Sequence, residues 1–413
     1  MINTFMPSER IMIRGKYLEG IRPHYESDLI KVLTGPRGSG KTTVLTAIMN
    51  EIDADDNHKI MINFEDSDYR SIRKATELNN LIEEKIKDGR YYLFFDEIQH
   101  VKDFERALAS FRVKYDCSIF VTGSNSALLS GELASLLVGR TKEFLIMPFS
   151  YSEAKEYMKF LEKEPNDDFF TDYLRMGGYP QRFQYDDETA VREYLEELYE
   201  SIIESDILKR KNENEKEKLK NVASFVLSNS GSRFSAQTVV DYLNKIHKSG
   251  KYISLQTVYN YLERMEKAFL IKRVKKYSIS GKAIMDSFVK NYVLDNGMSF
   301  INSNSMDLRD TYFLETLIYD ELISRGYEVY VGETYKAEVD FVVVKNGKKC
   351  FVQVAYLMTD EKTVEREFGA FSPIRSANPK YVMSLDKLDM SRDGIVHCNI
   401  TDFLDGKVDL YLT

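Results

Sequence analysis

One stretch, "LIKVLTGPRGSGKTTVLTAIMN" at 29–50, constrains the fold of this chain more than any other. A short apolar run at 29–34 predicts a buried strand, and the residues after Thr42 have the apolar spacing of a helix. Between them stands the pattern G-x-x-x-x-G-K-T, from Gly35 to Thr42. A strand, a glycine-rich loop and a helix in this order predict a loop whose backbone N–H groups surround a phosphate at the helix N-terminus.

The residues of this loop have separate expected roles. Lys41 is expected to reach the β- and γ-phosphates of a nucleoside triphosphate, and the hydroxyl of Thr42 is expected to ligate Mg²⁺. ATP and Mg²⁺ are therefore the predicted cofactors. The predicted phosphate-binding residues are Gly35, Pro36, Arg37, Gly38, Ser39, Gly40, Lys41, Thr42 and Thr43.

A second motif, "RYYLFFDEIQ" at 90–99, supplies carboxylates at the end of another predicted strand. Asp96 follows five aromatic or aliphatic residues, as expected for a buried parallel strand. We expect Asp96 to hold Mg²⁺ through water and Glu97 to polarise the attacking water as the general base. The simpler alternative is that both acids are solvated at the strand end. The presence of the glycine-rich loop favours the catalytic role.

Further strands are predicted at 59–66 and 117–125, and the second of these ends in small polar residues. Asn125, or Ser124, is a candidate for contact with the γ-phosphate or the attacking water. A turn or a helix cap is the alternative for either residue. The segment 126–140 has a helical pattern that ends in Gly139 and Arg140, before a strand that starts at 141. Arg140 is either an arginine finger for a neighbouring subunit or a solvated, helix-capping residue.

Together these motifs resemble the AAA+ ATPases. The sequences "GPRGSGKTT", "FFDEIQ", "VTGSNSALLSGELASLLVGR" and "MPFSYSEA" are similar to those of one prokaryotic group, which pairs an AAA+ module with a C-terminal region of unknown function. The resemblance covers essentially the whole chain. It implies a P-loop NTPase core with a helical lid, in which "RMGGYPQR" at 175–182 would lie. Arg182 is similar in placement to the second-sensor arginine of other AAA+ proteins.

The middle of the chain is predicted to be helical. Residues 150–220 have apolar side chains at three- and four-residue spacing, and 211–220 are either a solvated helix or a linker. Residues 221–297 predict three helices and a strand pair, which is the outline of a winged helix with Ser254 to Phe269 as its recognition helix.

Charge is distributed unevenly along the chain. The formal net charge is −8, yet residues 245–290 hold eleven Lys and Arg against three acids. Local basicity on a DNA-binding outline predicts phosphate contacts, and packing inside an ATPase assembly is the alternative. The basic residues are Lys245, Lys248, Lys251, Arg264, Lys267, Lys272, Arg273, Lys275, Lys276, Lys282 and Lys290.

The C-terminal segment, 306–413, predicts the element order αβββαβ with a hairpin turned at Asn346–Gly347. This order resembles the restriction-endonuclease-like fold. The resemblance places Glu315 and Asp340 at two metal-binding positions, but Gln353 and Ala355 stand where active members carry Glu and Lys. Because these ligands are missing, metal-dependent cleavage is not expected. Cleavage would need Lys348 or Lys349 of the turn to replace the missing lysine.

The length of 413 residues predicts several domains. The predicted fold is α/β, with a P-loop core at 1–150, a helical lid at 151–220, a winged helix at 221–304 and a restriction-endonuclease-like domain at 305–413. Three cysteines without metal-ligand spacing predict reduced thiols. No signal peptide or membrane helix is predicted, so a cytoplasmic location is expected.

Three hypotheses for function follow. The leading one is an ATP- and Mg²⁺-dependent AAA+ ATPase that forms a homo-oligomer and acts on DNA through 245–290 and the C-terminal domain. The second is a nucleotide switch that acts on a protein partner. The third is an ATP-regulated nuclease.

Overall fold

A computed structural model describes residues 10–125, 137, 139–208, 212–247, 252–302, 311–335 and 337–410. The chain divides into two compact units, Met1–Ile146 (unit 1) and Met147–Thr413 (unit 2), and each is described by itself. The sequence had placed the first boundary at 150. Within the described residues, no helix is both long and apolar enough to cross a lipid bilayer.

Unit 1 contains a five-stranded parallel sheet with the order β2-β3-β4-β1-β5. All five strands that the sequence predicted are present. Strands β1, β3 and β4 lie in the middle of the sheet and every one of their residues is buried, as their apolar sequences require. The strands are β1 Ile30–Thr34, β2 Lys59–Asn63, β3 Tyr91–Asp96, β4 Cys117–Gly123 and β5 Thr141–Leu145.

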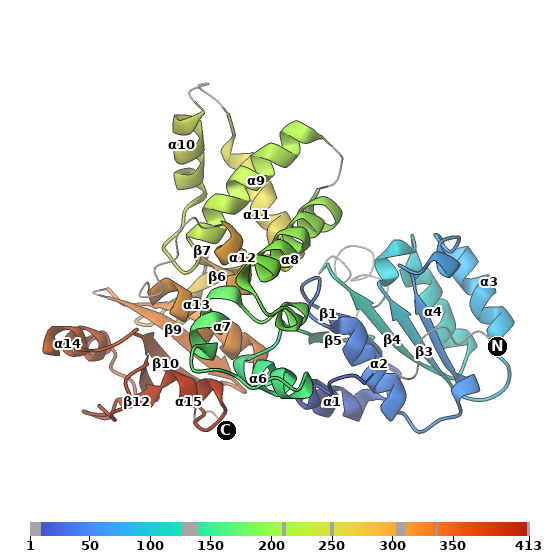
Figure 1. The fold of residues 1–413 in the computed structure, drawn as a ribbon, viewed down its shortest axis with the longest axis horizontal. Coiled ribbons are helices and arrows are strands. Elements are labelled where there is room, and N and C mark those ends of the chain that lie inside the picture. Colours follow the sequence, from blue (N-terminus) through green and yellow to red (C-terminus); the bar gives the residue numbers. More distant parts are fainter. Residues whose placement is uncertain are drawn as a thin grey trace. The chain divides into compact units, whose positions relative to one another are not determined.

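Helices cover both faces of this sheet (Figure 1). On one face, α1 (Gly15–Ile21) and α2 (Lys41–Glu51) bury apolar side chains against β1, β3 and β4. On the other face, α3 (Ala75–Lys85) and α4 (Phe104–Lys114) pack on the same strands. The helix predicted over 126–140 falls almost entirely outside the described residues. Unit 1 is therefore a three-layered α/β domain.

Unit 2 begins with helices that share one apolar core. The core takes side chains from α7 through α12 and from the adjoining ends of two strands, which explains the three- and four-residue apolar spacing. Helix α6 (Tyr151–Phe160) precedes them, and the helices of the core are α7 Phe169–Met176, α8 Glu188–Ser201, α9 Glu213–Ser228, α10 Ala236–Ile246, α11 Leu255–Lys267 and α12 Asn296–Asn302.

A seven-stranded sheet with the order β12-β11-β10-β9-β8-β6-β7 forms the rest of unit 2. Helix α13 (Thr311–Ser324) packs near β7 and β9, where the rings of Tyr292 and Tyr319 stack 4.3 Å apart. The strands are β6 Ile271–Ser278, β7 Ala283–Val293, β8 Glu328–Glu333, β9 Glu338–Lys345, β10 Lys348–Val354, β11 Lys380–Ser384 and β12 Val396–Asn399, and the remaining helices are α14 Glu361–Gly369 and α15 Ile400–Leu404.

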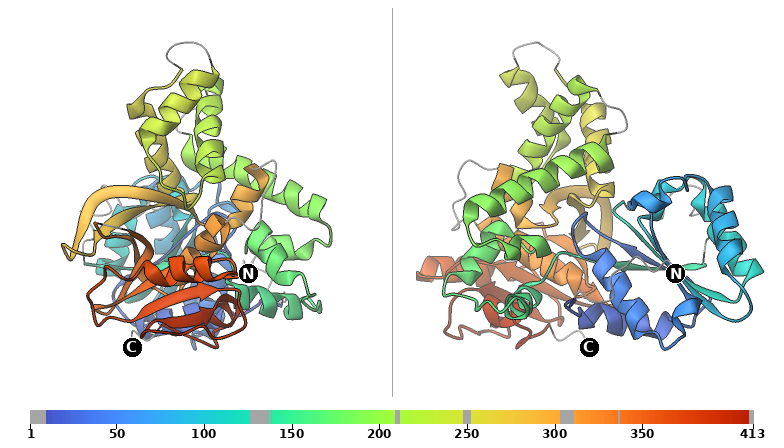
Figure 2. Two further views of the ribbon diagram at one scale, coloured as in Figure 1. Left: turned by 90° about the vertical axis from the view of Figure 1, so that its left-hand side faces the viewer. Right: turned by 45° about the vertical axis from the view of Figure 1, so that its right-hand side comes forward.

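This sheet differs from the predicted separation of a winged helix and a nuclease-like domain. The hairpin β6–β7, drawn in gold in Figure 2, was expected to be the wing of the winged-helix domain at 221–304. Instead β6 pairs in parallel with β8, through Lys276 and Val331, Tyr277 and Gly332, and Ser278 and Glu333. Pairing satisfies the backbone groups along an edge of β6 that a separate wing would leave open. The predicted boundary at 304 thus falls within one continuous sheet.

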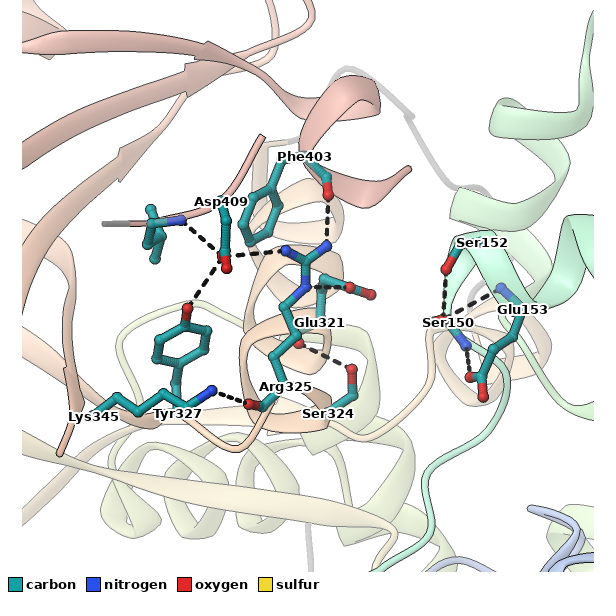
Figure 3. A network of polar contacts seen from close by, with 11 residues as sticks. Ser150, Ser152, Glu153, Glu321, Ser324, Arg325, Tyr327, Lys345, Phe403 and Asp409 are labelled. Atoms are coloured by element: carbon teal, nitrogen blue, oxygen red, sulfur yellow. Dashed lines mark hydrogen bonds and ion pairs between the residues drawn. The ribbon is translucent and has the colours of Figure 1, made fainter. Parts of the chain in front are cut away.

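A polar network holds the C-terminal segment of unit 2 (Figure 3). Arg325, which follows α13, donates to Glu321 at 2.7 Å and to the carbonyl oxygen of Phe403 at 2.5 Å. The same guanidinium donates to Asp409 at 3.5 Å, and the hydroxyl of Tyr327 donates to that carboxylate at 3.1 Å. These contacts fix α15 and the residues after it to the end of α13.

Candidate functional site

The candidate site lies at the carboxyl ends of β1, β3 and β4, which are neighbours in the sheet of unit 1. The glycine-rich loop follows β1, Asp96 ends β3, and Ser124 follows β4. The ends of parallel strands meet at one edge of a sheet, and this edge is where α/β proteins bind their ligands. The sheet order therefore brings together the three motifs that the sequence predicted separately.

The loop from Gly35 to Gly40 depends on glycine at particular positions. Gly38 and Gly40 have φ angles of 79° and 89°, which side chains rarely adopt. At Gly35 a Cβ atom would stand 2.1 Å from the carbonyl oxygen of Ile146, so the residue after β5 packs directly against the loop. The hydroxyl oxygen of Ser39 is buried without a hydrogen-bond partner among the described residues.

Two basic side chains hold the loop. The ammonium of Lys41, the first residue of α2, donates to the carbonyl oxygens of Pro36 at 2.9 Å and Gly35 at 3.1 Å. Lys41 thus lies inside the loop, where the sequence placed it. Arg14 donates to the carbonyl oxygen of Ser39 at 2.9 Å and is 3% exposed. Arg14 was not predicted from the sequence, because an arginine 25 residues before its partner gives no pattern that identifies it.

Thr42 and Asp96 form the pair that the sequence assigned to Mg²⁺. The Thr42 hydroxyl donates to the carboxylate of Asp96 at 2.8 Å. Thr122 of β4 donates to the other carboxylate oxygen at 2.5 Å. Burial raises the pKa of Asp96 to about 6, although both of these hydrogen bonds oppose the shift. A hydroxyl and a carboxylate are thus adjacent at the open end of the loop.

Glu97 is held in an unusual backbone conformation directly beside this pair. Its φ angle is 54°, in the left-handed region that glutamate rarely adopts, and its N–H donates to Thr122 at 2.9 Å. Ser124 donates to its carboxylate at 2.9 Å, and Gln99 donates to the other oxygen. Non-glycine residues in this region occur often at functional sites, where surrounding contacts hold them in place.

The pKa of Glu97 is set by opposing effects. Burial alone would raise it, but the positive charge of Lys41 and the hydrogen bonds from Gln99 and Ser124 together outweigh burial. The pKa of Glu97 therefore lies below its ordinary value, and the carboxylate is ionised at neutral pH. An ionised, oriented carboxylate is able to accept a proton from water, and this one lies next to the pair that the sequence assigned to Mg²⁺.

The other predicted residues of unit 1 occupy different places. Asn125 follows Ser124 at the same edge and is half-buried, and Ser124 is the one that contacts Glu97. Arg140 is exposed and precedes β5, whose first residue Thr141 pairs with Ile30 at the start of β1. Arg140 therefore lies at the edge of the sheet opposite the glycine-rich loop. The strand register thus separates Arg140 from the glycine-rich loop by the full length of β1.

In unit 2, Arg182 has internal partners. Its guanidinium donates to the carbonyl oxygen of Gly177 at 2.5 Å, lies 4.0 Å from the ring of Phe183 and is 5% exposed. Burial lowers the pKa of Arg182 to about 10. Its Nη2 atom is buried without a hydrogen-bond partner among the described residues, and the role as second sensor stays a prediction.

The nuclease-like positions are close together but differ from a metal centre. The Gln353 side chain accepts the N–H of Asp340 at 3.3 Å, and Asp340 accepts the N–H of Val354 at 2.8 Å. Ala355 is buried and bonds through its backbone to Met383. Glu315 on α13 accepts a hydrogen bond from Lys290 at 2.6 Å.

The turn lysines do not replace the missing lysine. Lys348 pairs with Lys345 at the turn end of the β9–β10 hairpin, five residues beyond Asp340. Lys349 donates at 2.9 Å to the hydroxyl of Tyr277, a residue of β6. The third hypothesis requires one of these lysines to lie beside Asp340, and neither does.

The basic residues of 245–290 are largely paired with acids. Six of the eleven have a carboxylate within 4.0 Å, among them Lys290, whose side chain is 4% exposed. Lys248 and Lys251 lie outside the described residues. Lys245 and Lys282 are exposed. Three of these pairs use Glu263 and Glu266, acids of the segment itself, so the acids outside the segment reduce the local excess of positive charge without removing it. The paired residues are Arg264, Lys267, Lys272, Arg273, Lys276 and Lys290.

Comparison with known proteins supports this description. A family model described as an AAA domain matches residues 27–155, which confirms the AAA+ resemblance. A model described as a domain of unknown function (DUF8612) matches residues 167–303. An uncharacterized protein of Haemophilus influenzae is 30% identical over 356 residues, covering 84% of this chain and 88% of that protein. An uncharacterized protein of Methanocaldococcus jannaschii is 31% identical over 356 residues, covering 83% and 78% respectively.

Solved structures with a similar trace have low sequence identity. The Aeropyrum pernix ORC1 protein in complex with DNA matches with a TM-score of 0.34 and 11% identity, over 75% of this chain and 91% of that one. DnaA from Aquifex aeolicus bound to AMPPCP matches with a TM-score of 0.33 and 15% identity, over 62% and 89%. From its sequence matches, the chain carries an AAA domain followed by a domain of unknown function, and it belongs to the same family as the two uncharacterized proteins of H. influenzae and M. jannaschii.

Proposed function

We propose that unit 1 binds ATP with Mg²⁺ and hydrolyses the γ-phosphate. The observation that carries this proposal is the arrangement of Asp96 and Glu97 across the mouth of the glycine-rich loop. Asp96 is paired with Thr42, and Glu97 is ionised and held by two side-chain donors. A phosphate-binding loop, a metal-binding pair and an oriented base are the components that phosphoryl transfer to water requires.

The residues present fit a nucleotide phosphate with its cation. The unpartnered hydroxyl of Ser39 and the left-handed backbone at Gly38 and Gly40 leave hydrogen-bonding groups for phosphate oxygens. Thr42 and Asp96 present two adjacent oxygens, the kind of ligand that Mg²⁺ prefers. When bound, Mg²⁺ would neutralise charge on the phosphates. Lys41 would exchange its contacts with the loop carbonyls for phosphate oxygens.

Glu97 has the role of general base in this proposal. Its carboxylate takes a proton from the attacking water, and Ser124 and Gln99 keep it in one orientation while it does so. The left-handed backbone of Glu97 comes directly after the strand that Asp96 ends. Asn125, at the end of the same strand as Ser124, is proposed to orient the water or the γ-phosphate.

The test is the Glu97→Gln variant of the full-length protein. We expect ATP binding to be retained and steady-state turnover to fall by about 10²- to 10⁴-fold, the usual contribution of a general base. Glu84→Gln, at an exposed position on α3, is the matched control and should keep wild-type turnover. Turnover in the Glu97 variant that equals the control would remove the general-base assignment.

DNA is the first target to test for unit 2. Helix α11, the predicted recognition helix, exposes Gln256, Tyr259 and Asn260, and amide side chains are suited to adenine edges. The paired cations limit how many phosphates this region contacts. We therefore expect a shallow dependence of affinity on salt, with a logarithmic slope of about −4 or less steep.

Steady-state ATP turnover with duplex, single-stranded and branched DNA, at low and moderate salt, tests this target. Stimulation that is lost in Gln256→Ala/Asn260→Ala but kept in Gln237→Ala, an exposed amide on α10, would support it. The second candidate is a switch that acts on a protein partner, and the pairing of many basic side chains with acids favours it. No stimulation by any DNA, with normal basal turnover, would select the switch.

A further inference from the structure

Lys290 lies at the centre of the nuclease-like part of unit 2, although the sequence placed it in a different domain. It belongs to β7, and its ammonium is 2.6 Å from Glu315 on α13 and 3.1 Å from Glu338 on β9. The hydroxyl of Tyr292, two residues further along β7, donates to the same oxygen of Glu315. Residues two apart on a strand share a face, so both side chains of β7 point at this glutamate.

We propose that Lys290 is the resident cation of this centre. Its ammonium holds Glu315 and Glu338 together, as a divalent cation would hold two carboxylates, and closes the centre to metal-dependent cleavage. The centre then serves to fasten the β6–β7 hairpin to the nuclease-like sheet. This inference goes beyond the ATPase proposal and does not depend on it.

The charges of the cluster balance without a metal ion. Arg233, between α9 and α10, donates to Glu338 at 2.7 Å and lies 3.5 Å from Glu333. Lys276 on β6 is also paired with Glu333. Three glutamates thus face three cations, counting Lys290 with Glu315. Asp340 is the fourth carboxyl group near Lys290, and burial raises its pKa well above the ordinary value, which disfavours a further negative charge there. Among the described residues, no three acids, histidines or cysteines are grouped so that they could hold a metal ion.

Access to the centre is also restricted. A cavity of about 150 Å³ opens beside it, and Arg233, Lys276, Glu333 and Glu338 line its walls. These four residues are the ion pairs just described, so the cavity offers no unpaired cation for a phosphate. Behind it, the side chains of Lys290 and Glu315 are 4% and 6% exposed. A phosphodiester could not reach Glu315 without breaking the cluster.

The position of the cluster in the fold explains what it achieves. Four segments that are distant in the sequence meet there: the α9–α10 connection, β6–β7, α13 and β8–β9. The first two precede residue 304, the boundary that the sequence predicted, and the last two follow it. A buried charge whose partner is removed is strongly destabilising, so the cluster favours the one arrangement in which all partners meet.

The first experiment is a double-mutant cycle on the full-length protein. Lys290→Met, Glu315→Gln and the double variant are compared by their urea midpoints, with Lys282→Met on the same hairpin as the control. Each single variant should lower the midpoint of unit 2, the double variant should lower it by less than the sum, and the control should leave it unchanged. If the two effects add, Lys290 does not balance Glu315 and the proposal is wrong.

The second experiment measures Mn²⁺ binding by electron paramagnetic resonance, without nucleotide. Every variant in this experiment also carries Asp96→Asn, so that the nucleotide site does not bind Mn²⁺. We expect no bound Mn²⁺ that depends on Glu315, and no nicking of plasmid DNA with Mn²⁺. Bound Mn²⁺ that disappears in Glu315→Gln would overturn the proposal. Because unit 1 is disabled throughout, this outcome is independent of the ATPase test.

Discussion

At the scale of single residues, Thr122 supports both acids of the nucleotide site. Its hydroxyl donates to Asp96 at 2.5 Å and accepts the N–H of Glu97 at 2.9 Å, with no exposed surface. We expect Thr122→Val to lower the free energy of unfolding by about 1–3 kcal/mol, because it leaves two buried polar groups unpaired. Turnover should fall at least tenfold with ATP affinity less changed.

Thr122→Ser is the matched variant, since it keeps the hydroxyl and loses only a methyl group. Chemical denaturation and steady-state ATP hydrolysis measure the two effects. A positioning role predicts that serine restores turnover. If valine keeps wild-type turnover and only stability falls, Thr122 is a structural residue alone.

Lys31 is a buried lysine near the start of β1. Its ammonium donates to Ser118 at 2.6 Å and to the carbonyl oxygen of Ser27 at 3.2 Å, and burial lowers its pKa to about 7. An unfolded lysine has a pKa of about 10.4, so between these values the unfolded chain holds a proton that the folded one lacks. The favourable contribution of Lys31 to the free energy of unfolding is therefore complete above about pH 10.4 and is lost as the pH falls toward 7.

We expect the free energy of unfolding of the wild type, relative to Lys31→Met, to rise between pH 7 and 9. The slope should be at most about 1.4 kcal/mol per pH unit, the value for one proton. Urea denaturation of both proteins at several pH values gives this difference, in which other titrating groups largely cancel. Parallel pH profiles would mean that Lys31 keeps its proton in the folded state.

The sequence predicted the parts of the site that depend on local order. The loop at 35–42 and the acids at 96 and 97 follow strands, so their chemistry is visible in short patterns. Thr122 and Arg14 were not found, because each meets a partner about 25 residues away and only the sheet order brings them together. Ser124 and Asn125 could not be separated by pattern, since both end the same strand.

At the scale of elements, the turn after α7 is built around a buried carboxylate. The N–H of Gly178 donates to Asp295 at 2.6 Å, and a Cβ atom on Gly177 would stand 1.7 Å from the same carboxylate. The N–H of Phe149 donates to the carbonyl oxygen of Gly178 at 2.8 Å. Residues 177 and 178 thus join the start of unit 2 to the segment before α12.

We expect Gly177→Ala to destabilise unit 2 by roughly 3 kcal/mol or more, from the positive φ together with the clash. Gly326→Ala separates these causes, because Gly326 has a φ of +76° and a methyl group added there would meet nothing within 4 Å. Its cost should be about 1–2 kcal/mol, from the backbone conformation alone. Equal losses in the two variants, by urea denaturation, would mean that the contact with Asp295 has room to relax.

Sheet elements were predictable where the turn is local. Asn346 and Gly347 have φ angles of 51° and 77°, the conformation that a two-residue hairpin turn favours, and the predicted β9–β10 hairpin is present. The parallel pairing of β6 with β8 was not predicted, because about fifty residues and two helices separate these strands. No short pattern specifies which edge a strand joins.

At the scale of the whole molecule, the charge of a segment proved a poor guide to its surface. The excess of basic residues at 245–290 is visible in the sequence, but their partners are not. Glu215 pairs with Arg264, and Glu333 pairs with Lys276, across 49 and 57 positions. Net charge therefore overstates the attraction of this region for DNA, since paired cations give weaker phosphate contacts than free ones.

Arg140 carries a prediction about assembly. In the register of β1 and β5, Arg140 is level with residue 29, six residue steps before Gly35, or roughly 20 Å along the sheet. We propose that the protein forms a homo-oligomer in which Arg140 meets the nucleotide of the neighbouring subunit. Arg140→Ala should then bind ATP normally and lose about 10³-fold or more in turnover, as removal of an arginine finger does.

Mixing two inactive variants tests this arrangement directly. Lys41→Ala lacks nucleotide binding but keeps Arg140, whereas Arg140→Ala has the opposite properties. Equal amounts, allowed to exchange subunits, should recover roughly a quarter of wild-type turnover, because one interface in four then combines an intact loop with an intact arginine. The control replaces Lys41→Ala with Lys41→Ala/Arg140→Ala, which supplies no arginine and should give no recovery. If mixed oligomers form by light scattering and turnover does not return, Arg140 is not a finger acting between subunits, and its exposure at the edge of the sheet has another cause.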